Sequence, residues 1–348
     1  MFLNPVTRKR WRRFRAFKRG YVSLIVLLAA VALSLAAELI ANHRAIIVKY
    51  DGTYYFPTFR FHAGHAFGQA SADGFDGGEA DYRALAAAWR GTADWVLLPP
   101  VPYGPLESDF SYASWPAAPD SRHWLGTDAQ GRDVLARLLY GFRISIFFAL
   151  GLAVVAQAFG VVIGSLQGYL GGIFDLASQR VIEVWTTLPF LYIVILLGTI
   201  VTPSFWALLV IMAAFSWMRI TFYMRTEMYR ERTRDYCLAA RAIGASGARI
   251  VFVHLLPNCL TPLVTFTPFL VVGAITALTG LDYLGYGLPA PTPSWGEMID
   301  QALQPENRKC LWLILAPFAA LVATLTLVTF IGESIREAFD PKHYTVYR

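Results

Sequence analysis

Charged residues are scarce in this sequence, and long stretches of it contain none. Asp, Glu, Lys and Arg make up 16% of the 348 residues, where soluble domains carry about 25%. Six uncharged runs stand out: Tyr21–Ala37, Ile144–Leu166, Val184–Thr202, Ser204–Met218, Cys259–Leu281 and Leu311–Gly332. A membrane-spanning helix needs about 20 mainly apolar residues, a length that five runs meet and that the fourth reaches if it continues past Arg219. The runs predict six transmembrane helices and argue against a soluble protein.

Cysteine and the signature motifs of enzymes are also sparse. Three cysteines, Cys237, Cys259 and Cys310, are too scattered to indicate a disulfide framework or a cysteine metal site. No G-x-x-x-x-G-K-[ST] sequence is present to bind ATP, and no H-E-x-x-H sequence is present to bind zinc. We therefore expect no catalytic residue, no cofactor and no metal in this chain.

Ionisable residues are missing from the middle of the runs. The nearest candidates, Glu38, Glu183, Arg219 and Asp282, all fall near run ends, whereas an ion-driven transporter normally carries such residues within its spans. Either another subunit supplies the energy or there is no active transport. A secondary transporter and a membrane-embedded receptor or structural subunit are the competing classes.

The distribution of basic residues predicts the orientation. Residues 1–20 contain eight Lys or Arg and no acid, which favours a cytoplasmic N-terminus and, with the long apolar run, an uncleaved first span over a cleaved signal peptide. Six spans then put 42–143, a turn near Pro203 and 282–310 outside, and 167–183, 225–257 and the C-terminal tail inside. Segment 42–133 has seven basic and eleven acidic residues, and 225–257 has six against three, as this topology requires. The basic residues lie at membrane ends, so we expect lipid rather than nucleic acid beside them.

The spans divide the chain into four parts. Residues 1–41 form a basic tail and the first span, 42–122 an outside insert, 123–340 a core of five spans, and 341–348 a tail. In the insert, Asp51-Gly52 between aromatic and β-branched residues predicts a β-hairpin. The acidic segment 69–81 lacks the EF-hand order and indicates a solvated loop rather than a calcium site.

The segment HWLGTDAQGRDVLARLLYGFR, 123–143, precedes the second span. Thr127 with Gln130 fits a capping box, which predicts an amphipathic helix that starts there and leads into the span. Asp128, Arg132 and Asp133 could form a catalytic cluster, but capping and charge pairing are the favoured interpretation.

The inside segment 225–257 has the pattern of two helices joined by a turn. Residues 225–243 contain no Pro or Gly and predict a helix, which Gly244 ends in a left-handed conformation. Ser246 caps a second helix over about 247–255, and Pro257 ends it. The small side chains of Ala239, Ala240 and Ala242 would let the turn approach a partner closely.

This loop resembles a known element. Its pattern is Leu238-Ala239-Ala240, three residues, Gly244, eleven residues and then Leu256-Pro257. This pattern resembles the EAA loop of ABC-importer permeases. That loop reads Glu-Ala-Ala, three residues, Gly, nine residues and then Ile-x-Leu-Pro. Leu238 stands where the family has Glu, and His254 where it has Ile. Two further segments are similar to the C-type subunit of oligopeptide and dipeptide permeases: WLGTDAQGRDVLARLLYGFRIS and LDYLGYGLPAPTPSWGEMI. The hairpin YDGTYYFP resembles the microcin C and peptide importer subgroup.

The resemblance implies an all-α membrane protein with the six-helix type I ABC-importer permease fold and a large periplasmic insert, in a bacterial inner membrane. It implies a homologous second permease, two ATPase subunits or one fused ATPase that bind ATP and Mg²⁺, and a periplasmic solute-binding protein. The expected function is peptide import; other solutes (nickel, glutathione or a sugar–peptide conjugate) stay as alternatives.

The resemblance also implies which residues contact the partners. Those expected to contact the ATPase are Asp235, Leu238, Ala239, Ala240, Arg241, Gly244, Ala245, Ser246, Leu256 and Pro257. At the outer mouth, Tyr283, Tyr286 and Trp295 are candidate contacts for substrate or binding protein, although aromatic residues at this depth are more often an interfacial belt.

Overall fold

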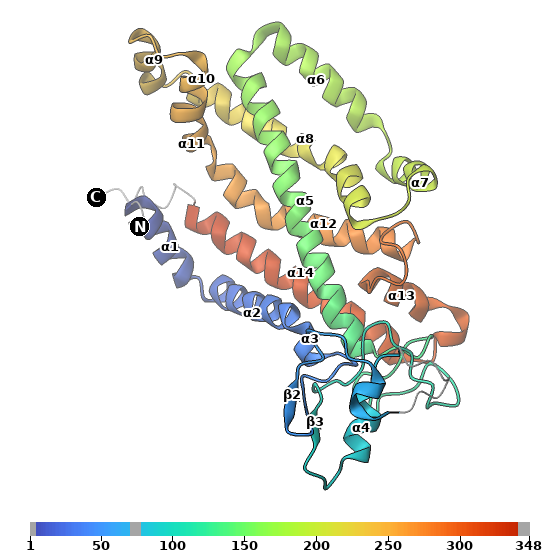
Figure 1. Ribbon diagram of the computed structural model, residues 1–348. Helices are drawn as coiled ribbons and strands as arrows, with labels where there is room; N and C mark the ends of the chain where they lie inside the picture. The colour runs from blue at the N-terminus through green and yellow to red at the C-terminus, as the bar shows by residue number, and fades with distance from the viewer. Residues whose placement is uncertain (1–4, 70–77, 340–348) are drawn as a thin grey trace.

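Long helices run through most of the molecule, and a small segment with a β-sheet lies at one end (Figure 1). The computed structural model describes residues 5–69 and 78–339, so the predicted tail 341–348 lies outside the described residues. The helical bundle consists of α2 (Lys18–Leu35), α5 (Val134–Leu170), α6 (Gly172–Thr187), α7 (Phe190–Ile200), α8 (Phe205–Glu231), α12 (Thr261–Tyr283) and α14 (Leu311–Phe339). The helix α1 (Pro5–Ala16) packs beside α14, and α13 (Trp295–Leu303) packs against α12 and α14.

The prediction of six spans is confirmed, with one change. Five helices are long and apolar enough to cross a membrane, and the pair α6–α7 supplies a sixth span when it is counted as one. The run Val184–Thr202 is not a single helix, because α6 and α7 meet at 77°. Pro189 disfavours helical backbone at the residue before it, and Leu188 accordingly has an extended ψ of 123°.

A row of glycines sets the distance between α5 and α8, the most extensive helix pair. Gly160, Gly164 and Gly168 recur every four residues and therefore lie on one face of α5. A Cβ added at Gly164 would lie 2.6 Å from the carbonyl oxygen of Thr221, and one at Gly168 would lie 2.7 Å from that of Arg225. Larger side chains here would push α8 away, so the glycines permit the close approach of the two helices.

The helix predicted to start near Thr127 starts later, at Val134. Gly126 and Gly131 have φ angles of 74° and 78°, a conformation that no α-helix contains. Asp133 caps the helix instead, because its Oδ1 accepts a hydrogen bond from the backbone N–H three residues later at 2.7 Å. No separate amphipathic helix precedes α5 in the described structure; the first turns of α5 occupy that place.

The insert has its own small core. The short helix α3 (Ala37–Ile40) leads into the insert, whose elements are β1 (Ile47–Tyr50), β2 (Thr53–Tyr55), η1 (Gly64–Phe67), α4 (Tyr82–Ala88) and β3 (Trp95–Leu97). The strands pair antiparallel in the order β2-β1-β3, around a core that includes Val48, Phe67 and Tyr82. The predicted hairpin is confirmed: Asp51 and Gly52 join β1 to β2 with positive φ at both residues. Part of the acidic segment 69–81 lies outside the described residues.

Charged side chains join the start of α5 to α13. The side chain of Arg137 is fully buried, pairs with Glu297 of α13, and has its Nε 3.4 Å from Asp128 Oδ2. Arg132 Nε lies 2.7 Å from the same Asp128 oxygen, and Arg132 also reaches Glu297. These contacts fit charge pairing, the favoured interpretation of this group, and they hold α13 against the first turns of α5.

A buried histidine lies between two carboxylates in the segment before α5. The His123 side chain is 1% exposed, with Nδ1 2.8 Å from Asp133 Oδ2 and Nε2 3.2 Å from Asp109 Oδ2. Burial alone would lower the pKa of His123, but the hydrogen bonds to Asp133 and Asp109 outweigh it and raise this pKa. Folding therefore favours the imidazolium form.

We expect His123 to stabilise the protein most at low pH. A group whose pKa rises on folding contributes fully below its unfolded pKa, about 6.5 for His, and loses that contribution as pH rises through its folded pKa. The thermal unfolding midpoint of the detergent-solubilised protein, measured from pH 5.5 to 9, should exceed that of His123→Gln most at the acid end. A difference between the two proteins that stays constant with pH would contradict this assignment.

Candidate functional site

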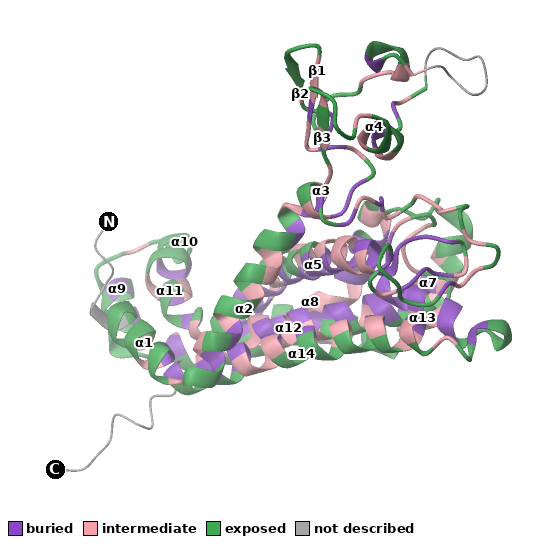
Figure 2. Ribbon diagram, turned by 90° about the horizontal axis from the view of Figure 1, so that it is seen from below, coloured by how far each residue is buried: buried purple, intermediate pink, exposed green. Residues whose placement is uncertain are grey.

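The loop between α8 and α12 folds into short helices at the opposite end of the bundle from the insert (Figures 1 and 2). They are α9 (Asp235–Ala242), α10 (Gly247–Arg249), the π-helical turn η2 (Ile250–Leu255) and α11 (Leu256–Cys259). The helix predicted over 225–243 is interrupted, because α8 ends at Glu231 and α9 begins at Asp235. The loop thus has the expected two-helix form, with one extra break.

Gly244 and Ser246 form the predicted turn. Gly244 has a φ of 82°, and its N–H donates to Arg241 O while the N–H of Ala245 donates to Ala240 O, both at 3.0 Å. This pair of hydrogen bonds is the Schellman motif that ends helices at a left-handed glycine. Ser246 Oγ accepts a hydrogen bond from the backbone N–H three residues later and starts the next helix.

Pro257 does not end the second helix as predicted. The helical backbone continues from Gly247 through α11, with the wider π turn of η2 before the proline. Pro257 lies in the first turn of α11, where a missing N–H is tolerated. The whole segment Gly247–Cys259 therefore acts as one irregular helix leading into α12.

One face of this loop packs against the bundle. Cys237 and Ala240 of α9 lie in a buried cluster with Met228 of α8 and with Ile250 and Leu255 of η2. Of the ten predicted ATPase-contact residues, seven are exposed, Ala245 and Leu256 are partly buried, and Ala240 is buried. The small side chain of Ala240 serves close packing inside the chain, so the expectation that it faces a partner does not fit its position.

The other face of the loop exposes large apolar side chains, of which the sequence analysis singled out only Leu238. The exposed fractions are 86% for Ile243, 66% for Phe252, 58% for Val253 and 50% for Leu238. Exposed apolar residues on such a projecting element are typical of a protein interaction site. A signal was present in the sequence: helical spacing that buries Ile250, Val251 and Leu255 leaves 252 and 253 facing outward.

Arginine contacts fix the loop to the bundle. Arg232 Nη1 donates to the carbonyl oxygens of Gly168 and Tyr169, at the end of α5, at 3.0 and 3.2 Å. Arg225 of α8 forms a bidentate pair with Asp175 of α6, at 2.5 and 2.6 Å. A force on the loop would thus reach α5, α6 and α8 through direct contacts.

A phenol holds the break between α8 and α9. Tyr236 OH donates to Glu231 Oε2 at 2.9 Å. Burial, and then the hydrogen bond to Glu231, raise the pKa of Tyr236 to about 12. The phenol therefore stays protonated and keeps donating at physiological pH.

The residues predicted to form the outer mouth lie at the end of α12, in the loop after it and in α13. Tyr283 and Tyr286 are 40% and 42% exposed, whereas Trp295 is 2% exposed and donates its Nε1–H to Leu138 O at 3.1 Å. Burial leaves Trp295 no surface to offer a ligand in this structure. Tyr286 lines a cavity of about 390 Å³ at this end, and the predicted ligand contact of the two tyrosines stays a prediction.

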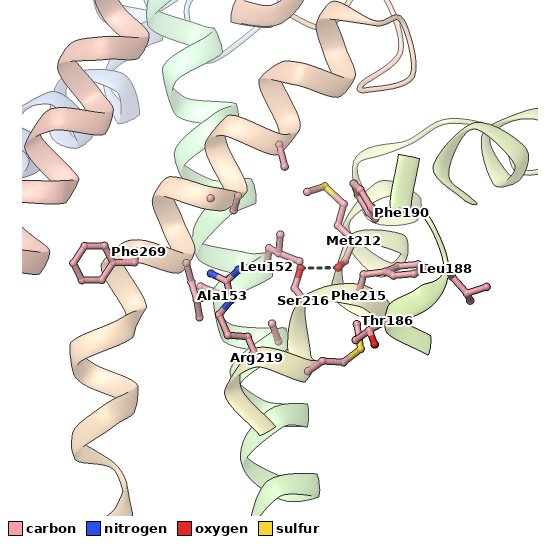
Figure 3. A pocket seen from close by; sticks show the side chains of 16 residues that line it. Leu152, Ala153, Thr186, Leu188, Phe190, Met212, Phe215, Ser216, Arg219 and Phe269 are labelled. Atoms are coloured by element: carbon pink, nitrogen blue, oxygen red, sulfur yellow. Dashed lines mark hydrogen bonds between the residues drawn. The ribbon is translucent and has the colours of Figure 1, made fainter. Parts of the chain in front are cut away.

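A second cavity, of about 370 Å³, lies among α5, α8, α12 and the α6–α7 pair (Figure 3). Its lining side chains are apolar except for Thr186, Ser216 and Arg219. The sequence analysis placed Arg219 near the end of a span, but α8 continues past it to Glu231. The structure therefore places this arginine inside the helix.

The sequence also matches a known family. A family model described as the binding-protein-dependent transport system inner membrane component matches residues 160–343, over half of the chain. The chain belongs to this family. The match spans α8, the loop α9–α11, α12 and α14, so it includes all the short helices between α8 and α12.

Full-length relatives agree with the family. The permease is 43% identical over 341 residues, 97% of this chain and 98% of the relative, to the inner membrane ABC transporter permease protein YejE of Escherichia coli K12. It is 38% identical over 98% of this chain, and 94% of the relative, to the peptidoglycan transport system permease protein YejE of Agrobacterium fabrum. The dipeptide transport system permease protein DppC of Haemophilus influenzae is 32% identical over 71% of this chain and 85% of its own length.

These findings confirm the resemblance to the oligopeptide and dipeptide type of ABC-importer permease. The permease is a multi-pass inner-membrane subunit and does not hydrolyse ATP itself. The first relative covers the insert as well as the helical core, so the insert is shared with that protein.

We predict that Gly244→Ala loosens the inner loop of the permease and leaves the bundle intact. A left-handed conformation costs a residue with a Cβ about 1–2 kcal/mol, which should speed amide hydrogen exchange in α9 about five- to thirtyfold. Exchange in α5 and α8 should not change. Gly198→Ala in α7, where no atom lies within 4 Å of an added Cβ, is the matched control. Unchanged exchange in α9, or equal changes throughout the bundle, would count against this role of Gly244.

Proposed function

We propose that the permease forms half of a pathway for peptides or peptide-containing fragments across the inner membrane, and that an ATPase drives it through the loop α9–α11. The observation that carries this proposal is the loop itself, which exposes Ile243 and Phe252 while Arg232 ties it to α5. The relatives' names support the substrate class, since they refer to dipeptides, oligopeptides and peptidoglycan.

The mechanism needs an element that transmits displacement without bending. ATP binding and hydrolysis on the partner would move α9, and the buried cluster around Cys237 and Met228 would carry the motion into α8. The close contact of α8 with the glycine face of α5 would then turn both helices together. Such coupling uses two arrangements of rigid elements and requires no chemistry in the permease.

The charge distribution supports an orientation with both termini in the cytoplasm. The basic helix α1 lies at the same end of the bundle as the loop α9–α11, and the acidic insert lies at the other (Figure 1). The positive-inside rule puts the basic end in the cytoplasm. The insert and the outer mouth then face the periplasm, where a solute-binding protein would deliver the solute.

The partners follow from this arrangement. We propose a homologous second permease to complete the pathway, and two ATPase subunits or one fused ATPase on the cytoplasmic side that bind ATP and Mg²⁺. Membrane lipid surrounds the spans. A peptide of the microcin C type remains a candidate substrate on the resemblance of the insert alone.

The docking proposal predicts that Ile243→Asp abolishes co-purification of the ATPase. Ile243 is 86% exposed, so an aspartate there leaves the fold intact but adds a desolvation cost at an apolar interface. The membrane subunits should still assemble and the ATPase should be lost after mild detergent extraction.

Phe110→Asp provides the matched control for this experiment, because Phe110 is 81% exposed at the opposite end of the molecule. This variant should retain the ATPase. Normal ATPase recovery with Ile243→Asp, or no ATPase with the unaltered protein, would refute docking through this loop.

A further inference from the structure

Arg219 lies on α8 at the level of the apolar part of the bundle, and it is exposed in the single chain. On α8 it precedes Ile220, whose side chain packs directly over Gly160 of α5. Gly160 is six residues from the inner end of the uncharged run Ile144–Leu166, which is about 9 Å at 1.5 Å per residue. A cation at this depth is costly, and such residues usually mark a substrate or ion pathway.

No carboxylate among residues 5–69 and 78–339 forms an ion pair with this arginine. Within the part of the chain that the structure describes, the side chain of Arg219 takes part in no ion pair or hydrogen bond. Six residues along the same helix, Arg225 has a bidentate carboxylate partner in Asp175. The guanidinium of Arg225, which joins α8 to α6, therefore has its hydrogen-bond acceptors within the chain. The five N–H donors of Arg219 remain available.

The side chain of Arg219 faces the cavity of about 370 Å³ (Figure 3). This volume is in the range of sites for small ligands. Ser216, one turn earlier on α8, donates its hydroxyl to Met212 O at 2.8 Å, and in the described structure no hydrogen bond joins it to the guanidinium of Arg219. A cation that faces a largely apolar cavity is arranged to receive an anion from outside the chain.

We propose that Arg219 binds a carboxylate of the transported solute as the solute passes through this cavity. The proposal rests on the proposed peptide-import function. A planar guanidinium forms two parallel hydrogen bonds with a carboxylate, which would orient the C-terminus of a peptide in the pathway. Arg219 is exposed at this cavity, so solvent screening would keep the pair weak enough for release. Arg219 would then set a preference for solutes with a free carboxylate.

The test uses the complete transporter, with its second permease, ATPase and binding protein, in proteoliposomes. The probes are labelled tri-alanine, which has a C-terminal carboxylate, and tri-alanine amide, which has none, each with saturating binding protein. Arg219→Gln should lower tri-alanine uptake about tenfold relative to the unaltered transporter, the loss expected for one charge-assisted hydrogen-bond pair. Uptake of the amide should be unchanged, and Arg219→Lys should restore most of the tri-alanine uptake.

Controls separate this role from packing and from lipid binding. Ser216→Ala changes the same cavity without altering charge and should leave both peptides unaffected; co-purification of the subunits checks assembly of every variant. An equal loss for both peptides, or no loss for either, would overturn the proposal. A loss seen only in liposomes with phosphatidylglycerol, and absent in phosphatidylcholine alone, would identify a lipid phosphate as the ligand and also overturn it.

The experiment also distinguishes failure of the proposed function. If the unaltered transporter takes up neither peptide, the import of peptides is wrong and the role of Arg219 falls with it. If the unaltered transporter and the Arg219→Gln variant take up each peptide at the same rate, peptide import stands and only the role of Arg219 is refuted.

Discussion

The close packing of α5 against α8 is the constraint on which the rest of this structure depends. Gly160, Gly164 and Gly168 give α5 a face without side chains, and α8 lies directly on it. In a membrane, where apolar side chains gain little by leaving lipid, small residues of this kind allow helices to associate through close contact. The cavity lies beside the middle of the α5–α8 pair, and the loop α9–α11 follows the end of α8. Both therefore depend on these three glycines.

Ion pairs join helices at both ends of the bundle, whereas the described residues include no charged partner for Arg219. At the outer end, Arg132 and Arg137 pair with Asp128 and Glu297 and hold α13 in place. At the inner end, Arg225 and Asp175 join α8 to α6. Pairs of this kind hold elements in register, because removing one partner leaves a buried charge uncompensated. Arg219 lies between these two sets.

Much of the fold was predictable because its signals are local. Uncharged runs indicated the spans, Asp51-Gly52 indicated the hairpin, and Gly244 with Ser246 indicated the inner turn. Each of these elements depends on a few neighbouring residues, whose backbone preferences allow only one local conformation. The start of α5 was misjudged because Thr127 and Gln130 fit a capping pattern that the two flanking glycines prevent.

The site was predictable only in part, because burial depends on contacts between distant segments. The loop was located correctly, but nothing in its own sequence indicated that Ala240 faces inward onto Met228. The fourth span was expected to continue past Arg219, and α8 does so, but the uncharged run ending at Met218 did not indicate that this side chain lines a cavity. The three glycines of α5 could be seen in the sequence at four-residue spacing. Their role in close helix packing becomes evident only from the position of α8 in the structure.

Photo-crosslinking from position 243 in the native membrane tests the central claim most directly. A photoreactive amino acid at this position, the most exposed apolar residue of the loop, should form a crosslink to an ATP-binding subunit. The same amino acid at position 110, at the other end of the molecule, should not. Crosslinks from position 243 to lipid alone, with no ATP-binding protein, would contradict an ATP-driven permease coupled through this loop.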